Sequence, residues 1–364
     1  MQVLLWGALY HPHLGGEERY IARLATGLLA QGAQVEVVTN TLPGSPTTEV
    51  VDGVAVTRLP FPRSRQGDLA ALREVRSGLR MVFERLRPDV VNLHTSGPSL
   101  AHLALHRSVV NVPLVVTFHG VYPSTRAVQS AVAAAVGGCA VAIATSSATR
   151  TSLDALCGSR LLPIDVHHPA VGSVNVGPVP LPRSGIVLGV GRHVPEKGWE
   201  HLLRAFEMVR LRAPAATLRL VGDGPDRQRL EALAAASLPS GVATFTGEID
   251  DRELIVEMDA ADVVVMPSVH EEGFGMVAIE AAARGRPVVA SARGGLHEAV
   301  IDGVTGLLVA PADPRELATA IVTVLSDHRR ADEFGSAGIR HSERFSAGKL
   351  ARSTLASFER ALLR

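Results

Sequence analysis

Residues 267–287 read P-S-V-H-E-E-G-F-G-M-V-A-I-E-A-A-A-R-G-R-P and place a glycine turn at the start of a helix. The apolar run before them, 261–266, is typical of a buried strand, and the alanine-rich 276–284 is typical of a buried helix. The first N–H groups of such a helix have no partner within it and lie at the positive end of its dipole. The stretch therefore predicts an anion site, with phosphate as the natural ligand.

Two glutamates bracket this predicted site. Glu272 lies just before the turn, and Glu280 lies about one helical turn further in, roughly 6 Å along at 1.5 Å per residue. Carboxylates repel phosphate, so they are better suited to accept hydrogen bonds from hydroxyls on either side of it. Hydroxyls on both sides of a phosphate describe a nucleotide sugar. Alternatively, Glu272 is a neighbour of the helix start and Glu280 a solvated helix residue, although the apolar neighbours of Glu280 favour a partner for it.

The segment E-G-F-G-M-V-A-I-E resembles the E-x7-E motif of the retaining glycosyltransferases of family four, which have the GT-B fold. Glu271 is a competing first carboxylate, but only Glu272 has the seven-residue spacing to Glu280. The resemblance implies that Glu280 binds the ribose hydroxyls. It implies that Glu272 binds a sugar hydroxyl and supports positive charge at the anomeric centre. The residues that it places at the donor diphosphate in this segment are Gly273, Phe274, Gly275 and Met276.

The composition is that of an ordinary globular protein. A chain of 364 residues favours two domains, and its formal net charge of zero gives no reason to expect nucleic acid. Cys139 and Cys157 are too few for a disulfide framework or a metal cluster, and they suit a reducing cytoplasm. The first residues lack the basic segment of a signal peptide, and no apolar run is long enough to cross a membrane. We therefore expect a cytoplasmic protein.

Strand-like and helix-like segments alternate along the chain. The expected strands are 3–6, 35–39, 54–59, 90–94, 114–118, 140–145, 186–190, 217–221, 243–245, 261–266, 287–291 and 306–309. The expected helices are 17–31, 69–87, 127–136, 199–212, 226–236, 251–259, 276–284, 314–325 and 347–363. This alternation predicts parallel sheets that are covered by helices on both faces.

Residues 172–185, G-S-V-N-V-G-P-V-P-L-P-R-S-G, lose all periodicity and are rich in proline and glycine, as in a linker. We expect an acceptor-side domain at 1–171 and a nucleotide-sugar-binding domain at 186–345. The last helix, 346–364, would pack back toward the first domain. The resemblance makes both domains doubly wound and Rossmann-like, facing each other across a cleft at the carboxyl ends of their strands.

Residues 189–198, G-V-G-R-H-V-P-E-K-G, follow the first strand of the second domain. A dinucleotide-binding G-x-G-x-x-G would need glycine where Val194 stands. The stretch resembles instead the family's G-R-x-x-x-x-K-G segment, in which Arg192 and Lys197 would clamp the diphosphate and neutralise the leaving group. The alternative is a solvated loop. Lys197 and Lys349 are the only lysines among the 36 basic residues, and a lysine kept here favours a need for its compact ammonium, with drift as the alternative.

Two further glycine segments resemble family loops. Gly15 and Gly16 match a G-G-x-E-R loop that faces the donor diphosphate and the acceptor. They also suit a simple turn into a helix, because Glu17 and Glu18 favour the positive helix start without any ligand. Gly222, in V-G-D-G-P, matches a loop beside the nucleotide and is equally consistent with a plain turn.

His119 ends the strand-like run L-V-V-T-F-H-G and matches the family's T-x-H-G segment, which implies a place near the donor sugar. His94, at the end of the neighbouring strand, is a weaker candidate with an acceptor-side or structural role. Gly294 and Gly295 resemble a family segment that we interpret as architectural. No H-x-E-x-x-H cluster or Asp-x-Asp motif occurs, so we expect no metal and no cofactor beyond the nucleotide-sugar co-substrate.

The resemblance implies a retaining glycosyltransferase of the hexosyltransferase type, which we expect to be metal-independent. It would move a sugar from a nucleoside diphosphate sugar to a hydroxyl or other nucleophile of a soluble small molecule. One alternative is a lipid-linked acceptor, with peripheral membrane contact through the basic helix 69–87. The apolar stripe of that helix is, however, expected to be used up in packing on its own sheet. A nucleotide-sugar epimerase or phosphorylase on the same fold, and a binding protein without turnover, are further alternatives.

Overall fold

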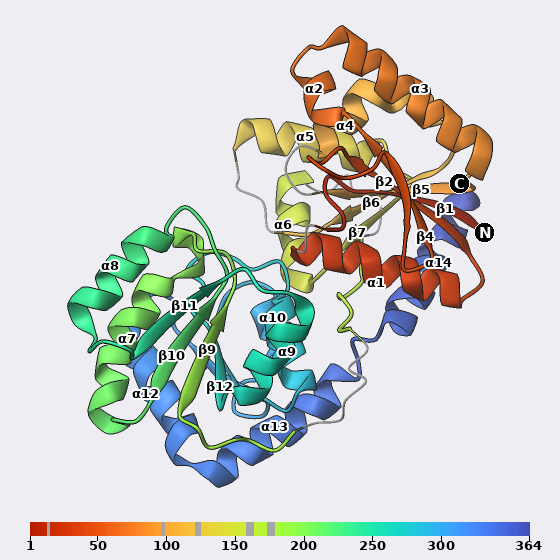
Figure 1. Cartoon of the computed structure of the whole chain (residues 1–364). Helices are drawn as coiled ribbons and strands as arrows, with labels where there is room; N and C mark the ends of the chain where they lie inside the picture. Colours follow the sequence, from red (N-terminus) through yellow and green to blue (C-terminus); the bar gives the residue numbers. More distant parts are fainter. Residues whose placement is uncertain (13–14, 96–98, 121–124, 158–163, 173–178) are drawn as a thin grey trace. The chain divides into compact units, whose positions relative to one another are not determined.

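The computed structural model describes residues 1–12, 15–95, 99–120, 125–157, 164–172 and 179–364 (Figure 1). The chain divides into two compact units. The first comprises Met1–Ala170 together with Ser346–Arg364, and the second comprises Val171–Phe345. Of the predicted linker at 172–185, residues 173–178 lie outside the described residues. Each unit is built on one sheet with helices on both faces, which confirms the predicted α/β class.

The sheet of the first unit has the order β3-β4-β2-β1-β5-β6-β7-β8. Its strands are β1 (Gln2–Trp6), β2 (Gln34–Asn40), β3 (Thr48–Val51), β4 (Val54–Leu59), β5 (Val90–Thr95), β6 (Leu114–Phe118), β7 (Val141–Ala144) and β8 (Ile164–Val166). All neighbours pair in parallel except β3 with β4. The chain builds outward from β1 through β2 and β4, then restarts on the other side at β5, so the switch point lies between β1 and β5.

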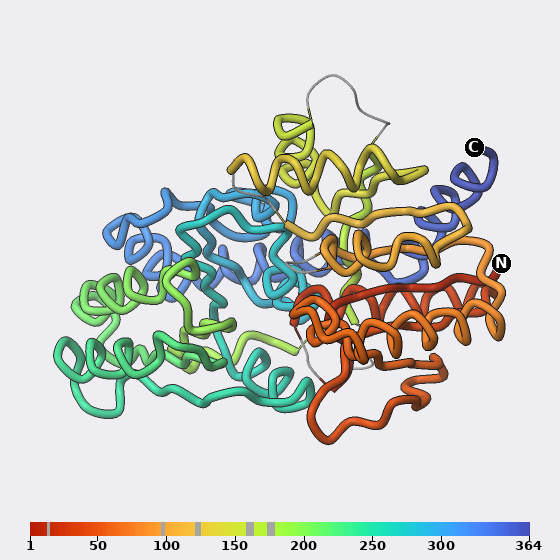
Figure 2. Tube along the Cα trace, turned by 90° about the horizontal axis from the view of Figure 1, so that it is seen from above, coloured from red at the N-terminus to blue at the C-terminus, as the bar shows by residue number. Residues whose placement is uncertain are grey.

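Helices cover both faces of this sheet (Figure 1). One face carries α1 (Gly16–Ala30) and α14 (Ala347–Leu362), and their apolar residues share one core cluster. The helices of the other face are α2 (Phe61–Arg65), α3 (Leu69–Leu86), α4 (Ser99–His106), α5 (Arg126–Gly137) and α6 (Ser147–Cys157). Figure 2 shows the C-terminal helix, in blue, beside the red N-terminal segment. The two ends of the chain therefore stabilise the same unit.

The sheet of the second unit is entirely parallel, in the order β11-β10-β9-β12-β13-β14. Its strands are β9 (Ile186–Val190), β10 (Thr217–Val221), β11 (Ala243–Gly247), β12 (Val263–Met266), β13 (Val288–Ser291) and β14 (Gly306–Val309). Every residue of β12 and β13 is buried, as strands covered on both faces require. The chain runs from β9 to β11 in one direction and from β12 to β14 in the other. The switch point therefore lies between β9 and β12.

The helices of the second unit also form two layers (Figure 1). The layer on one face contains α7 (Trp199–Arg212), α8 (Arg227–Ser237) and α12 (Pro314–Ser326). The layer on the other contains α9 (Asp251–Ala260), α10 (Met276–Ala283) and the short α11 (Leu296–Ala299). Helix α13 (His328–Ser342) packs against α10 and α12.

Some elements escaped prediction, and one expectation was wrong. The elements that the sequence analysis did not predict include β3, β8, α2, α4, α6, α11 and α13. In α13 the two glycines Gly335 and Gly338 weaken helix propensity. A Cβ on Gly335 would lie 2.4 Å from the carbonyl oxygen of Gly285, so glycine is what allows α13 to pack on the turn after α10. The wrong expectation is that packing on the sheet uses up the whole apolar stripe of helix 69–87. Leu69, the first residue of α3, is 67% exposed.

Gly27 gives a test of the contact between α1 and α14. A Cβ there would lie 2.6 Å from the carbonyl oxygen of Ala347. Alanine in place of a helical glycine ordinarily stabilises a helix by about 0.5–1 kcal/mol. We expect Gly27→Ala instead to lower the free energy of unfolding by about 1–3 kcal/mol, because backbone atoms must move. Urea unfolding followed by circular dichroism measures the change.

Gly137 is the matched control. It ends α5 in the same unit, and no described atom lies within 4 Å of the Cβ that alanine would add. Gly137→Ala is expected to leave stability unchanged or slightly raised. Equal effects of the two substitutions would contradict the proposed close contact.

Candidate active site

The loops that follow β9 and β12 lie next to each other at the carboxyl edge of the second sheet. These strands are neighbours although β10 and β11 separate them in the chain, so their loops flank the switch point. In doubly wound α/β sheets, ligands bind at this point. The first loop carries Arg192 and Lys197, and the second carries Glu272. Three of the four predicted catalytic residues thus belong to one place in the fold.

Lys197 and Glu272 form an ion pair between the two loops. Nζ of Lys197 lies 2.6 Å from Oε1 of Glu272, and the hydroxyl of Ser268 donates to the same oxygen at 2.5 Å. The side chain of Glu272 is 15% exposed and that of Lys197 is 27% exposed. The pair is thus partly shielded from water, which makes it stronger than a surface pair. Lys197 has enough exposure to meet a ligand.

Opposing effects act on the Glu272 carboxyl. Its burial tends to raise the pKa, while the charge and hydrogen bond of Lys197, the Ser268 hydroxyl and the charge of Arg192 lower it. The result is a pKa below the ordinary value of a glutamate. Glu272 is therefore ionised at neutral pH, and the charges of Lys197 and Arg192 favour this ionised form.

Backbone contacts hold the two loops together. Gly198 has a left-handed backbone with φ 71°, and a Cβ there would lie 2.1 Å from the carbonyl oxygen of Pro267. The N–H of Val269 donates to the carbonyl oxygen of Glu196 at 3.0 Å. The indole N–H of Trp199 donates to the carbonyl oxygen of Arg192 at 2.9 Å. Neither Trp199 nor Ser268 was predicted from the sequence as a residue of this site. The signal for Trp199 was a rare, large aromatic directly after the loop glycine.

The helix start predicted from residues 267–287 is present. Gly275 precedes α10 in a left-handed conformation with φ 99°, no side chain caps the helix, and its first turn has no acidic residue. Gly294 and Gly295 pack against the backbone of this turn. A Cβ on Gly294 would lie 2.2 Å from the carbonyl oxygen of Glu272, and the N–H of Gly295 donates to that oxygen at 2.8 Å. Because neither a side-chain cap nor an acidic residue occupies the start of α10, this helix start suits an anion.

The other predicted donor-binding residues of this unit differ in what they can contribute. Phe274 is buried, and its ring packs against Phe345 with centroids 5.2 Å apart, so only its backbone can face a ligand. Gly273 lies in the turn before it, and Met276 and Glu280 are half-buried in the first two turns of α10.

Gly222 allows a close contact between neighbouring loops. Its φ is 124°, and a Cβ there would lie 2.2 Å from the carbonyl oxygen of Gly191. The loop after β10 can therefore lie directly against the loop that carries Arg192. This close approach explains, without any role in nucleotide binding, why position 222 is a glycine.

The remaining predicted residues, Gly15, Gly16 and His119, belong to the first unit. Gly15 precedes α1 without a side-chain cap. A Cβ on Gly15 would lie 2.2 Å from Oε2 of Glu18, and both Glu17 and Glu18 are buried in the first turn. Helix α1 thus has acidic side chains of its own at its start, which makes it a poorer anion site than α10.

His119 follows β6 and bonds to His94 at the end of β5. Nε2 of His119 lies 2.9 Å from Nδ1 of His94. The ring of Tyr20 packs edge-on against both, with centroids 4.8 Å from His119 and 5.6 Å from His94. Burial lowers the pKa of His119 to about 3, so the ring is neutral at physiological pH. His94, the weaker candidate in the sequence, is fully buried and forms a hydrogen bond with His119.

Comparisons with known proteins cover nearly the whole chain. The family model described as Glycosyltransferase Family 4 matches residues 14–172, and the model described as Glycosyl transferases group 1 matches residues 180–341. D-inositol 3-phosphate glycosyltransferase of Arthrobacter sp. (strain FB24) is 31% identical over 96% of this chain and 90% of its own length. The chain belongs to the family-four glycosyltransferases.

Two further similarities agree with this assignment. The 2-deoxystreptamine N-acetyl-D-glucosaminyltransferase of Streptomyces fradiae is 34% identical over 90% of this chain and 86% of its own length. Sucrose-phosphate synthase from Thermosynechococcus elongatus has a similar structure, with a TM-score of 0.85 and 25% identity over 100% of both chains. The fold of this family-four glycosyltransferase is thus GT-B. Its activity is glycosyl transfer from a nucleoside diphosphate sugar.

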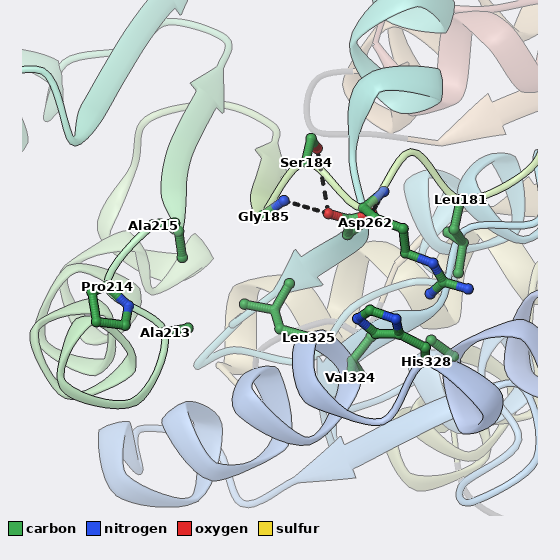
Figure 3. Close-up of a pocket in the computed structure, with 13 residues that line it drawn as sticks. Leu181, Ser184, Gly185, Ala213, Pro214, Ala215, Asp262, Val324, Leu325 and His328 are labelled. Carbon is green, nitrogen blue, oxygen red and sulfur yellow. Dashed lines mark hydrogen bonds between the residues drawn. The ribbon is translucent and has the colours of Figure 1, made fainter.

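A cavity of about 240 Å³ in the second unit of the glycosyltransferase lies away from this site. Its lining includes Ser184, Ala216 and Asp262, which precede β9, β10 and β12 and so mark the opposite edge of the sheet. Figure 3 shows Ser184 and the N–H of Gly185 donating to the Asp262 carboxylate, at 3.3 and 2.5 Å. Because these groups already donate to the carboxylate, we interpret the cavity as part of the contact that anchors the chain before β9 to Asp262.

Within the described ranges, no group of three or more His, Cys, Asp or Glu is placed to hold a metal ion. No helix among those described is long and apolar enough to cross a membrane.

The lowered pKa of Glu272 predicts a pH-dependent contribution to the stability of the glycosyltransferase. The charged carboxylate stabilises the folded state above the ordinary glutamate pKa of about 4.3. This contribution is lost as the pH falls through the lower folded-state pKa. We expect Glu272→Gln to cost about 1.5–3 kcal/mol at pH 7, the scale for a hydrogen bond to a charged group, and progressively less toward pH 3. Urea unfolding across this range measures the difference.

Glu271→Gln is the matched control. Glu271 is the adjacent residue, is 41% exposed, and forms a surface pair with Arg293 at 3.2 Å. We expect a change within about 0.5 kcal/mol at every pH. A difference between wild type and Glu272→Gln that does not vary with pH would show that the carboxylate charge is not what stabilises the loops.

Proposed function

We propose that the protein is a retaining, metal-independent hexosyltransferase whose donor diphosphate binds at the switch point of the second unit. The observation that supports this most is the Lys197–Glu272 pair beside the uncapped start of α10. The loop that carries Arg192 and Lys197 and the loop that leads into α10 follow neighbouring strands at one edge of the sheet. A diphosphate needs both cations and N–H donors, because its charge is large and its oxygens accept many hydrogen bonds.

Arg192 and Lys197 would stabilise the leaving group. As the bond between the sugar and the diphosphate breaks, negative charge builds on the β-phosphate oxygens, and preorganised cations lower the barrier. Lys197 is held by Glu272 at 2.6 Å before any ligand arrives, so little reorganisation is needed when the donor binds. In this proposal the two side chains supply the positive charge that a divalent metal supplies in other transferases.

The two glutamates would bind hydroxyls on either side of the phosphates. Glu280 would accept from the ribose, and Glu272 would accept from the sugar and stabilise positive charge at the anomeric carbon. Glu272 is suited to this because its pKa lies below the ordinary value, which keeps it charged. The family resemblance gives His119 a role toward the donor sugar, and gives Gly15 and Gly16 a role toward the donor diphosphate and the acceptor.

Retention would follow from attack on the face that the diphosphate leaves. The departing phosphate oxygen would accept the proton of the acceptor hydroxyl, so that no separate protein base is needed. The anomeric configuration of the product, read from proton coupling constants, tests this directly. A product with inverted configuration would overturn the proposed mechanism while leaving glycosyl transfer in place.

We propose a soluble, polyhydroxylated small molecule as the acceptor. Two relatives carry names that specify such acceptors, D-inositol 3-phosphate and 2-deoxystreptamine. A lipid-linked acceptor is the alternative, and α3 provides an observation for it, since Leu69 and Met81 are 67% and 61% exposed on an arginine-rich helix. Sedimentation with anionic vesicles distinguishes the two, because binding that survives physiological salt would favour the lipid.

Substitution of the cations tests the proposed site. We expect Lys197→Ala and Arg192→Ala each to lower kcat by roughly 10²–10³, the scale for losing one transition-state charge partner. Lys349→Ala is the matched control, because Lys349 is the other lysine and lies on the exposed side of α14. It should change kcat by less than about twofold.

The donor for this assay is chosen by a thermal-shift screen of nucleoside diphosphates, since a ligand that binds only the folded protein raises Tm. Circular dichroism controls for folding. If a folded Lys197→Ala variant keeps the wild-type kcat, Lys197 is not part of the site.

A further inference from the structure

His94 and His119 lie at the ends of neighbouring strands at the carboxyl edge of the first sheet. Strands β5 and β6 pair in parallel, with His94 opposite Thr117, and His119 directly follows β6. Nδ1 of His94 lies 2.9 Å from Nε2 of His119. A contact between two imidazole nitrogens needs one N–H donor and one lone-pair acceptor. It therefore fixes the place of the proton on both rings.

Both rings are neutral at physiological pH. Burial lowers the pKa of His119 to about 3. Burial, and then the charge of His119, lower the pKa of His94 well below its ordinary value. Tyr20, which packs against both rings, is also neutral, because burial raises the pKa of its phenol. Each imidazole thus carries one proton, and the pair has two alternatives: His94 donates to His119, or His119 donates to His94.

The second nitrogen of His94 separates these alternatives. Its Nε2 is buried and has no hydrogen-bond partner among the residues that the structure describes. If His119 donated, His94 would carry its proton on this Nε2 and leave an N–H buried without an acceptor. Such orphaned N–H groups are rare and costly in folded proteins. If His94 donates from Nδ1, only a lone pair is left without a partner, which proteins tolerate more often.

We propose that His94 is a positioning residue that donates its Nδ1–H to Nε2 of His119 and so holds the proton of His119 on Nδ1. His119 then presents a neutral N–H donor at its second nitrogen. This inference rests on the proposed function, in which His119 lies near the donor sugar. A histidine with a pKa of about 3 is a poor base at neutral pH, but a fixed N–H can donate to a sugar oxygen whatever the pH above that value.

Two substitutions of His94 separate hydrogen bonding from packing. Asparagine places an amide N–H close to where histidine holds Nδ1, so His94→Asn keeps a donor, whereas His94→Leu fills similar space without one. We expect His94→Leu to lower kcat by about 10- to 100-fold with a smaller change in the KM of the donor. His94→Asn should recover most of the loss. Steady-state kinetics with the donor chosen by thermal shift measures both.

His106→Leu is the matched control. His106 is also fully buried in the first unit, and its Nε2 lies 3.3 Å from Oγ of Ser64. Its loss should lower stability without lowering kcat. An equal loss of kcat in His106→Leu and His94→Leu would mean that buried histidines act here through stability alone, and would overturn the proposal.

The tautomer itself is measurable without any substrate. Long-range ¹H–¹⁵N spectra distinguish Nδ1–H from Nε2–H imidazoles, and comparison with His119→Gln assigns the signals of His119. We expect the Nδ1–H form in the wild type and a mixture of forms in His94→Leu. An Nε2–H form of His119 in the wild type overturns the proposal, even if His94→Leu does not fold. Wild-type kcat in a folded His94→Leu overturns it as well.

The same experiments separate this inference from the function on which it rests. If His119→Gln turns over at the wild-type rate while the wild-type ring shows the Nδ1–H form, the role of His119 in sugar binding fails. The hydrogen bond from His94 would then still be established.

Discussion

The ion pair between Lys197 and Glu272 is the interaction on which the site depends. It joins the loop after β9 to the loop after β12, and the two residues are 75 positions apart in the chain. These loops flank the point at which the strand order of the sheet reverses. Each charge offsets the cost of shielding the other from water, so both can be present in the folded protein before a ligand arrives. The pair also keeps the ammonium beside the uncapped start of α10. In the proposed function, a diphosphate would therefore meet a preorganised cation and the helix start together.

Close contacts between backbones make this arrangement rigid. Gly198 against Pro267, Gly222 against Gly191 and Gly294 against Glu272 each leave no room for a Cβ. The first unit is built differently, because acidic side chains occupy the start of α1 and the histidine pair is neutral. The start of α10 is therefore the better place for an anion, and the proposed function assigns the donor diphosphate to it.

Much of this could be predicted from the sequence because the deciding signals are local. The glycine turn before α10, the alternation of strands and helices, and the spacing of Glu272 and Glu280 are all visible in short windows. What was missed depends on contacts between distant segments. Helix α13 has glycines that weaken its propensity, and the reason for Gly335 is its close packing on Gly285, which is distant in the sequence. The bond of Ser268 to Glu272 and that of His94 to His119 required the register of neighbouring strands and loops, which no short window contains.

We propose that Lys197 binds the donor diphosphate at the switch point of the second unit. Calorimetric titration of wild type and Lys197→Ala, with a nucleoside diphosphate and with its parent nucleoside, tests it most directly. We expect the substitution to weaken binding of the diphosphate about 10- to 100-fold, the scale for one charged hydrogen bond, and to leave binding of the nucleoside unaffected. Equal affinity of both proteins for the diphosphate, or an equal loss for both ligands, would contradict it.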